Sequence, residues 1–476
     1  MNPTQTLSAA RQRWVLVLAA VSSLMVLLDV TVVVTALNTI RLQLNASIDQ
    51  LEWTLNAFTL TFAVLLMSAA ALGDRFGQRR MLVIGLGLFT FGSAACALAP
   101  SIGWLIAARA VQGTAAALVM PHAMALLSAA FPPQQRGRAL GIFSSITGIA
   151  LIGGPAFGGV VVQGLAWQWI FWFNVPIGLV LIPLILSRIQ ESARRTASLD
   201  FGGAALVSGG ALGLVWGLIR ANVDGWASVE VIAPLAAGVI LLTSFVAWEL
   251  RMRQPMLPMR YFRSRAFSAG NAAGFLLQAS TFGAVFFFPQ YLQTTLHYGP
   301  LDAGLRLVPW TANLFVVAPI AGSLVNRLGE RQLVVPGLLL QAAALAAIGL
   351  IAHTGGGYSA MLVPLILAGV GASMAMPAQQ NAVISSVPPA SIGVAAGTLN
   401  TLRQLGGTFG VAILAAVFTG NGSYASAASF SDGFVAAIGA AALMALLGAI
   451  VGAGLPGRRS AAQTVLATAP VLAEAA

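Results

Sequence analysis

The stretches GDRFGQRR, Gly73 to Arg80, and NRLGERQ, Asn326 to Gln332, are two copies of one pattern. At a constant offset of 252 positions, the matched residues are Asp74, Arg75, Gly77 and Arg79 with Asn326, Arg327, Gly329 and Arg331. Farther along the chain an offset of 256 relates Gly113, Pro121, Pro132, Pro133, Gly141 and Gly154 to Gly369, Pro377, Pro388, Pro389, Gly397 and Gly410. A loop accommodates the four-residue change in offset. The sequence therefore predicts a chain built from two related halves.

Composition places both halves in a membrane. The chain has 476 residues, of which 58% are hydrophobic and only 8% charged, and its mean hydropathy is +0.87. A soluble chain carries about 25% charged residues, so we predict an all-α polytopic membrane protein. Fourteen apolar stretches are long enough to span, at about 20 residues each. They begin near Trp14, Glu52, Met81, Trp104, Arg138, Gln168, Phe201, Glu230, Phe267, Ala303, Leu333, Ser359, Ala395 and Ser431.

The repeat relates the second span to the tenth and the fifth to the thirteenth, a shift of eight spans. Two six-helix halves with two extra helices between them produce this shift. We therefore divide the chain into a cytoplasmic N-terminus (1–13), an N-terminal six-helix bundle (14–187), a linker with two extra transmembrane helices (188–266), a C-terminal six-helix bundle (267–454) and a cytoplasmic tail (455–476).

Arginine positions predict the orientation in the membrane. All 24 basic residues are Arg. With the N-terminus inside, nineteen of them fall on the inner side, while Arg41, Arg220 and Arg306 fall outside and Arg109 and Arg403 lie within spans. This asymmetry follows the positive-inside rule. It also accounts for the net charge of +11 without a nucleic-acid partner. We predict a multi-pass protein of the bacterial cytoplasmic membrane with both termini cytoplasmic, retaining its first helix because residues 1–13 are too polar for a cleaved signal.

The absence of Lys and the scarcity of Cys and His exclude several functions. A phosphate-binding P-loop requires a Lys, so the chain is not its own ATP-hydrolysing pump. One Cys, Cys96, allows no internal disulfide. Three scattered residues, His122, His297 and His353, give no metal-ligand spacing. We expect no enzyme activity, no cofactor and no metal, and therefore an ion gradient as the energy source.

Asp29 is the only charged residue between Trp14 and Arg41. A carboxylate deep in a span costs roughly 2.5–3.5 kcal/mol on insertion scales, which makes it a functional-site hypothesis by default. Because burial disfavours the charged form, such a group can take up and release a proton. The alternative is a structural Asp that bonds a neighbouring helix.

Arg109 lies about five residues into the fourth span, in RAVQGTAAALVMP. A buried guanidinium cannot lose its proton and needs a partner. Asp29, backbone carbonyls and water are the candidates. If Asp29 and Arg109 share one cavity, protonation of the carboxylate frees the Arg and can couple proton and substrate movement. The alternative is that the side chain snorkels to the membrane surface.

Two further motifs indicate conformational change. The loop at Gly73 combines Gly77, which is free to take a positive φ, with Asp74, Arg75, Arg79 and Arg80. Its charges can hold two helices together in one state and release them in another, or can serve topology alone.

The stretch GIALIGGPAFGG in the fifth span is a poor helix interior but permits close helix packing in a membrane. We predict a pivot and seal there, against the alternative of ordinary small-residue packing. Its motif residues are Gly148, Gly153, Gly154, Pro155, Gly158 and Gly159.

Aromatic residues near the spans are candidates to stack on a flat apolar or cationic ligand, although a core or interface-belt position is the more common explanation for any single one. The substrate-cavity candidates are Trp53, Phe58, Phe62, Phe286 and Trp310.

Together these motifs resemble the major facilitator superfamily, in which parallel six-span repeats enclose a site near the midplane. Within it they resemble the fourteen-spanner drug:proton antiporters. The Gly73 loop, the fourth-span stretch from Arg109 to Pro121 and the fifth-span stretch from Gly148 to Gly159 resemble family motifs, the last one marking exporters. LDVTVVVTALNTI resembles the first-span motif, in which the Asp is implicated in proton coupling. QWIFWFNVPIG, Gln168 to Gly178, and LDFGG, Leu199 to Gly203, are similar to later signatures.

The chain departs from the family pattern where the first-span motif usually has Pro and this chain has Asn38. Its other acidic residues near spans sit at helix ends: Glu52 and Asp302 outside, Asp200 and Glu249 inside. The geometry of the first helix at its outer end is therefore open, as is assistance to Asp29 from Glu52.

The resemblance implies a monomeric proton-driven exporter of hydrophobic or cationic small molecules such as drugs, antibiotics and dyes. Asp29 would exchange protons beside Arg109, and the lipid bilayer, the substrate and protons would be its partners. Alternatives are a narrow exporter of one antibiotic or metabolite, an uptake symporter and, from another class, a membrane-embedded enzyme.

Overall fold

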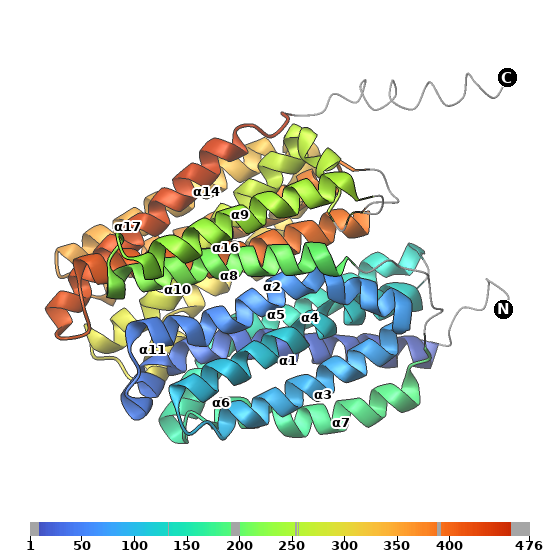
Figure 1. Ribbon diagram of the computed structural model, residues 1–476, viewed down its shortest axis with the longest axis horizontal. Coiled ribbons are helices and arrows are strands. Elements are labelled where there is room, and N and C mark those ends of the chain that lie inside the picture. The colour runs from blue at the N-terminus through green and yellow to red at the C-terminus, as the bar shows by residue number, and fades with distance from the viewer. Residues whose placement is uncertain are drawn as a thin grey trace.

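The computed structural model describes residues 9–131, 133–191, 200–252, 255, 257–387 and 392–457. These residues form helices joined by short loops, with no strand among them (Figure 1). Fourteen helical segments run back and forth through the molecule, as predicted. Over the described residues, twelve of them are long and apolar enough to cross a membrane.

The first half comprises α1 to α7. The bounds are α1 (Ala9–Leu44), α2 (Ile48–Phe76), α3 (Gln78–Ala97), α4 (Ile102–Ala130), α5 (Pro133–Gly164), α6 (Trp169–Trp172) and α7 (Asn174–Arg188). Within it α1 packs on α4 and α5, and α4 packs on α2 and α3.

The middle pair is α8 (Phe201–Asp224) and α9 (Val229–Arg251). The second half begins with a short 3₁₀ turn, η1 (Met259–Arg263). It continues with α10 (Arg265–Thr294), α11 (Pro300–Leu305), α12 (Val308–Thr311), α13 (Asn313–Leu328), α14 (Arg331–His353), α15 (Tyr358–Ile384), α16 (Ile392–Asn421) and α17 (Ala427–Gly452).

Two of the fourteen segments are broken, one between α6 and α7 and the other on both sides of α12. Proline has no N–H to offer the carbonyl four residues earlier. For Pro176 that carbonyl belongs to Trp172, the last residue of α6, and for Pro309 it belongs to Leu305, the last residue of α11. The breaks after α6 and after α11 therefore fall one turn before a proline, and the first places Asn174 at the start of α7. The second segment breaks again between α12 and α13, where no proline follows one turn later.

The repeat detected in the sequence reappears in the backbone. Gly77 ends α2 with a φ of 107°, and Gly329 ends α13 with a φ of 91°. Both values lie in the left-handed region that favours glycine. The two matched loops therefore turn in the same way, which explains why both copies keep Gly at this point.

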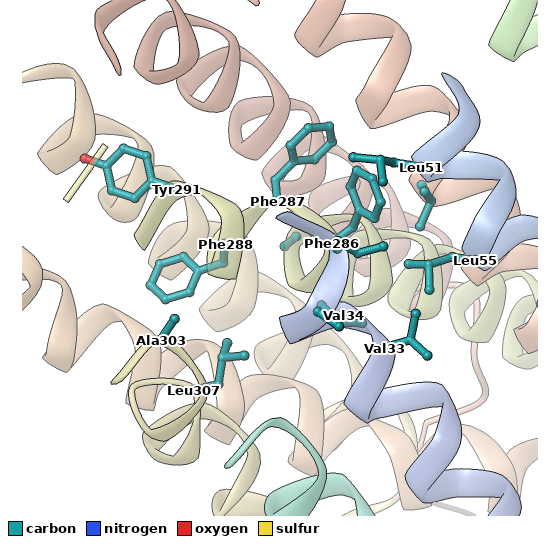
Figure 2. Packing of buried hydrophobic residues seen from close by; sticks show 14 of the residues in the cluster. Val33, Val34, Leu51, Leu55, Phe286, Phe287, Phe288, Tyr291, Ala303 and Leu307 are labelled. Atoms are coloured by element: carbon teal, nitrogen blue, oxygen red, sulfur yellow. The ribbon is translucent and has the colours of Figure 1, made fainter. Parts of the chain in front are cut away.

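The halves meet tightly at one end of the molecule, where α1 ends and α2 begins. The arginine pattern predicts this end to be outside, and we call it the outer end. Figure 2 shows Val33 and Val34 of α1 and Leu51 and Leu55 of α2 facing Phe286 and Phe287 of α10. All six side chains are buried in one cluster. The outer end is therefore shut.

Two further contacts join the halves. The Thr408 hydroxyl on α16 donates to Thr59 Oγ1 on α2 at 2.8 Å. A Cβ atom placed on Gly159 of α5 would lie 2.5 Å from Leu301 Cα of α11, so only glycine fits there. The fifth-span motif thus touches the opposite half.

The middle pair covers one side of the junction between the halves. In Figure 1, α8 lies alongside α2 and α16. Ala211 of α8 shares a buried cluster with Leu60 of α2 and Leu405 of α16, and Trp216 of α8 packs on Trp53, their ring centroids 5.6 Å apart.

We predict that Gly159→Val prevents the outer end from closing, because the valine Cβ would displace Leu301. Overpacking of this kind costs about 1–3 kcal/mol, enough to favour an open outer end. The measurement is the reaction of Val34→Cys with a membrane-impermeant maleimide, which should rise in the Gly159→Val background.

Gly164→Val is the matched control, because a Cβ there has nothing within 4 Å. Equal labelling of Val34→Cys in both backgrounds would contradict the seal assigned to Gly159.

Candidate functional site

Asp29 lies at the centre of a buried polar network in the first half. Its side chain sits on α1 with 2% of its surface exposed. One carboxylate oxygen, Oδ2, forms an ion pair with Arg109 Nη1 on α4. The other, Oδ1, accepts from Gln112 Nε2 at 3.2 Å and from Asn174 Nδ2 at 2.9 Å. Three helices therefore converge on one carboxylate.

The Arg109 side chain is surrounded by hydrogen-bond acceptors and aromatic rings. Only 1% of the side chain is exposed, so the snorkelling alternative is wrong. Its Nε donates to the Thr54 carbonyl of α2 at 3.2 Å, and Nη1 also donates to Gln112 Oε1 at 2.9 Å. The guanidinium carbon lies 4.4 Å from the Phe58 ring centroid and 5.8 Å from that of Phe171. Aromatic faces stabilise a desolvated cation.

Gln112 carries the network to α3. It stands three residues after Arg109, and residues at that spacing share one helix face. Gln112 Nε2 donates to Ser93 Oγ at 2.8 Å, and Cys96 Sγ donates to Gln112 Oε1 at 3.1 Å. The amide thus uses its donor and acceptor groups together to fix the position of Arg109.

A buried ion pair of this kind is sensitive to protonation. Taking two charges out of water costs several kcal/mol per ion, and removing one partner leaves the other uncompensated. The pair has net charge zero with Asp29 ionised and net charge +1 with Asp29 protonated, because Arg keeps its proton. A second cation about 10 Å away would feel a difference of roughly 1.7 kcal/mol at an effective dielectric constant of about 20. The geometry can therefore make proton and cation binding compete.

The fifth-span motif presses directly on the helix that carries Asp29. A Cβ on Gly154 would overlap the Thr31 hydroxyl, and one on Gly158 would lie 2.8 Å from the Val32 carbonyl. Thr31 Oγ1 also donates to the Ala150 carbonyl of α5 at 3.0 Å. On the opposite half, a Cβ on Gly304 of α11 would overlap the Pro155 carbonyl. Through α5, the surroundings of Asp29 touch the second half.

Gly153 packs less closely than Gly154 and Gly158. Gly153 has only Ile149 within 4 Å of a built Cβ, and Gly148 is a further helical residue of α5.

The Gly73 loop is fastened to the end of α7 by a residue that the sequence analysis missed. Glu191 accepts from the backbone N–H of Arg79 at 3.0 Å and of Arg80 at 3.2 Å. Its carboxylate also pairs with both guanidinium groups at 3.8 Å. An anion at a helix start is favourable, and here it stands at the start of α3.

Other positions in the loop are crowded or exposed. A Cβ on Gly77 would lie 2.5 Å from the Glu191 carboxyl carbon, and one on Gly73 would overlap the His122 ring. Arg75 is exposed. The side chain of Asp74 lies outside the described part of the structure. The gating role of this loop stays a prediction.

The aromatic candidates are packed against protein. Phe58 lies over Arg109 and near Phe62, their centroids 6.1 Å apart. Phe286 and Trp310 are buried in the cluster that shuts the outer end, and Trp53 packs on α8. Their substrate role stays a prediction for another conformation.

Two cavities among the described residues have walls that contain none of those aromatic candidates. One of about 310 Å³ has Asp29 and Asn174 in its wall, with apolar residues of α1, α5, α6 and α7 around them. The other, of about 490 Å³, lies between α2, α8, α9, α10 and α16 and is lined by apolar side chains and two Thr. Pockets of this size suit small organic ligands.

Asp29 and Arg109 meet as the sequence analysis envisaged, while Gln112, Asn174 and Glu191 were missed. A signal existed for two of them. Gln112 follows Arg109 by three residues, and Asn174 is the one amide in QWIFWFNVPIG after the aromatic run. No comparable pattern pointed to Glu191.

Comparison with known proteins places this site in a family. The sequence profile of the Major Facilitator Superfamily matches residues 19–411. The chain is 36% identical to a tetracenomycin C resistance and export protein of Streptomyces glaucescens, over 84% of this chain and 75% of that one. It is 34% identical to a methylenomycin A resistance protein of Streptomyces coelicolor, over 93% and 92%. It is 33% identical to the multidrug resistance protein Stp of Mycobacterium tuberculosis, over 88% and 76%.

Solved structures agree on the fold. The POT family transporter PepTSo superposes with a TM-score of 0.71 at 12% identity, covering 95% of this chain and 98% of that one. A D-xylose-proton symporter gives 0.67 at 15% identity, covering 94% and 98%. The predicted architecture is thereby confirmed: the chain is a multi-pass membrane protein that belongs to the major facilitator superfamily.

Proposed function

We propose that this protein exports hydrophobic or cationic small molecules in exchange for protons, with Asp29 as the proton-binding group and Arg109 as its charge partner. The observation that carries the proposal is the buried Asp29–Arg109 pair, since α1, which carries Asp29, packs against α5 at the junction of the halves. The resistance and export proteins among its relatives support the direction of transport.

The exchange follows from charge. With Asp29 ionised, the pair is neutral and a cationic substrate can bind nearby. Protonation leaves Arg109 as an uncompensated cation, which disfavours that substrate and weakens the link between α1 and α4. The ionised state of Asp29 therefore favours bound substrate, and the protonated state favours an empty site. Such a difference in affinity between two states is what couples two binding events. A proton crossing inward gains roughly 2.3 kcal/mol per 100 mV of membrane potential.

The setting that we propose is a bacterial cytoplasmic membrane, with both termini inside and the chain acting as a monomer without a cofactor. The distribution of Arg supports this orientation. The gradient replaces nucleotide hydrolysis, because a chain without Lys has no P-loop.

A narrower function is the second candidate, because two of the relatives carry the name of a single antibiotic. The cavity walls, mostly apolar and without fixed polar anchors beyond Asp29, Asn174 and Thr side chains, favour the broader range.

Cells that express the protein should lose several unrelated dyes faster than control cells, and an uncoupler should abolish the difference. The readout is the fluorescence of ethidium, rhodamine 6G and Hoechst 33342 during efflux. Export of one compound alone would select the narrow function, and uncoupler-resistant dye accumulation on expression would contradict export altogether.

Asp29→Asn should reduce dye efflux to the level of cells lacking the protein, because the amide cannot exchange a proton. The amide oxygen still accepts from Arg109, so the purified variant should elute as a folded protein in size-exclusion chromatography.

Asp224→Asn, at an exposed ion pair with Arg220, is the matched control and should export normally. Uncoupler-sensitive efflux that persists in Asp29→Asn would remove Asp29 from the mechanism.

A further inference from the structure

Glu52 is a buried carboxyl group outside the Asp29 network. It lies in the second turn of α2 with 2% of its surface exposed. Its Oε2 atom is buried without a hydrogen-bond partner, and no ion pair involving Glu52 occurs in the described part of the chain. A buried carboxylate without a partner is strongly disfavoured against its neutral acid. Glu52 is therefore a neutral acid while the outer end is shut.

The position of Glu52 ties its burial to the closure of the outer end. Neighbouring residues on a helix point about 100° apart. Leu51 faces Phe287 of α10 in Figure 2, and Trp53 packs on Trp216 of α8. Glu52 points between these two directions, toward α16 and the loop that follows it. The second half thus supplies part of the cover over Glu52.

Tyr424, in the loop between α16 and α17, is the polar neighbour on that side. Its hydroxyl donates to Gln290 Oε1 of α10. Burial raises the pKa of Tyr424 and Arg41 opposes the rise, while an ionised Glu52 would add to it. The guanidinium carbon of Arg41 lies 4.5 Å from the Tyr424 ring centroid, and Arg41 Nε has no hydrogen-bond partner.

The charged groups around Glu52 come from each element near it. Asp49 lies one turn earlier on α2 and disfavours a second negative charge. Arg41 of α1 lies over the ring of Tyr424. On α8, Arg220 is paired with Asp224 at 3.5 Å. On α4, Arg109 is paired with Asp29. None of these cations forms an ion pair with Glu52 in the described structure.

We propose that Glu52 is a second proton-binding group, which must take up a proton from the outer solution before the outer end can close. With the outer end open, water reaches the carboxyl group and Glu52 ionises. Closure removes that water and gives the Glu52 Oε2 atom no hydrogen-bond donor in its place. Because an ionised carboxylate would then be buried without a partner, Glu52 must bind a proton before closure. Reopening returns the proton to the same side.

Glu52 and Asp29 thus have different roles. Asp29 would carry protons across the membrane, whereas Glu52 moves none across and instead makes closure depend on external pH. This inference rests on the alternation between open and closed states that the proposed export requires. It predicts that Glu52→Gln keeps the proton-to-substrate ratio, while closure of the outer end no longer depends on external pH.

The test measures closure without substrate. Spin labels on Leu42→Cys and Thr354→Cys, one in each half at exposed positions near the outer end, report the distance across it by electron paramagnetic resonance. The protein carries Asp29→Asn, so that Asp29 does not titrate. In lipid nanodiscs, the closed distance should lose population as pH rises from mildly acidic to mildly alkaline.

Adding Glu52→Gln should abolish this dependence, so that the population with the closed distance stays the same at every pH, because Gln is neutral. Asp49→Asn, at the start of α2, is the matched control and should retain the dependence. An equal pH response with Glu52→Gln, or no response in the Asp29→Asn parent, would overturn the inference. Neither result depends on export, so a failure here is distinct from a failure of the proposed function.

Discussion

The structure of the first half depends on one buried ion pair, between Asp29 and Arg109. Both partners are removed from water, so each requires the other and the amides of Gln112 and Asn174 as well. This requirement fixes the relative positions of α1, α4 and α7. It also makes the arrangement conditional, because a single proton on Asp29 removes the charge that Arg109 needs.

Helix α5 packs both on α1, which carries Asp29, and on α11 of the second half. Gly154 and Gly158 bring α5 against the residues that directly follow Asp29, while Gly159 and the Pro155 carbonyl meet α11 of the second half. Contacts this close cannot absorb a displacement by compression, because packed interfaces move between discrete arrangements. The outer cluster around Phe286 and Phe287 then shuts the same end at which Glu52 is buried.

The sequence predicted most of the fold, because membrane spans and their order follow from hydropathy and Arg placement alone. The repeat predicted that the two halves are related, and the positive φ angles of both Gly77 and Gly329 agree with this prediction. The breaks before Pro176 and Pro309 were missed because prolines inside membrane helices are often tolerated. Asp29 and Arg109 stood out as charges in apolar runs, whereas Asn174 and Gln112 carry no charge. Glu191 acquires its partners only through the tertiary contact between α7 and the Gly73 loop.

The central claim, that Asp29 exchanges its proton for substrate, is tested most directly by infrared difference spectroscopy of the purified protein. At mildly acidic pH, addition of a transported dye should remove a protonated-carboxyl band and release protons into the medium. Both signals should be absent in Asp29→Asn and present in Glu52→Gln. If Asp29→Asn still lost the carboxyl band and released protons on dye addition as the unsubstituted protein does, the account would be contradicted.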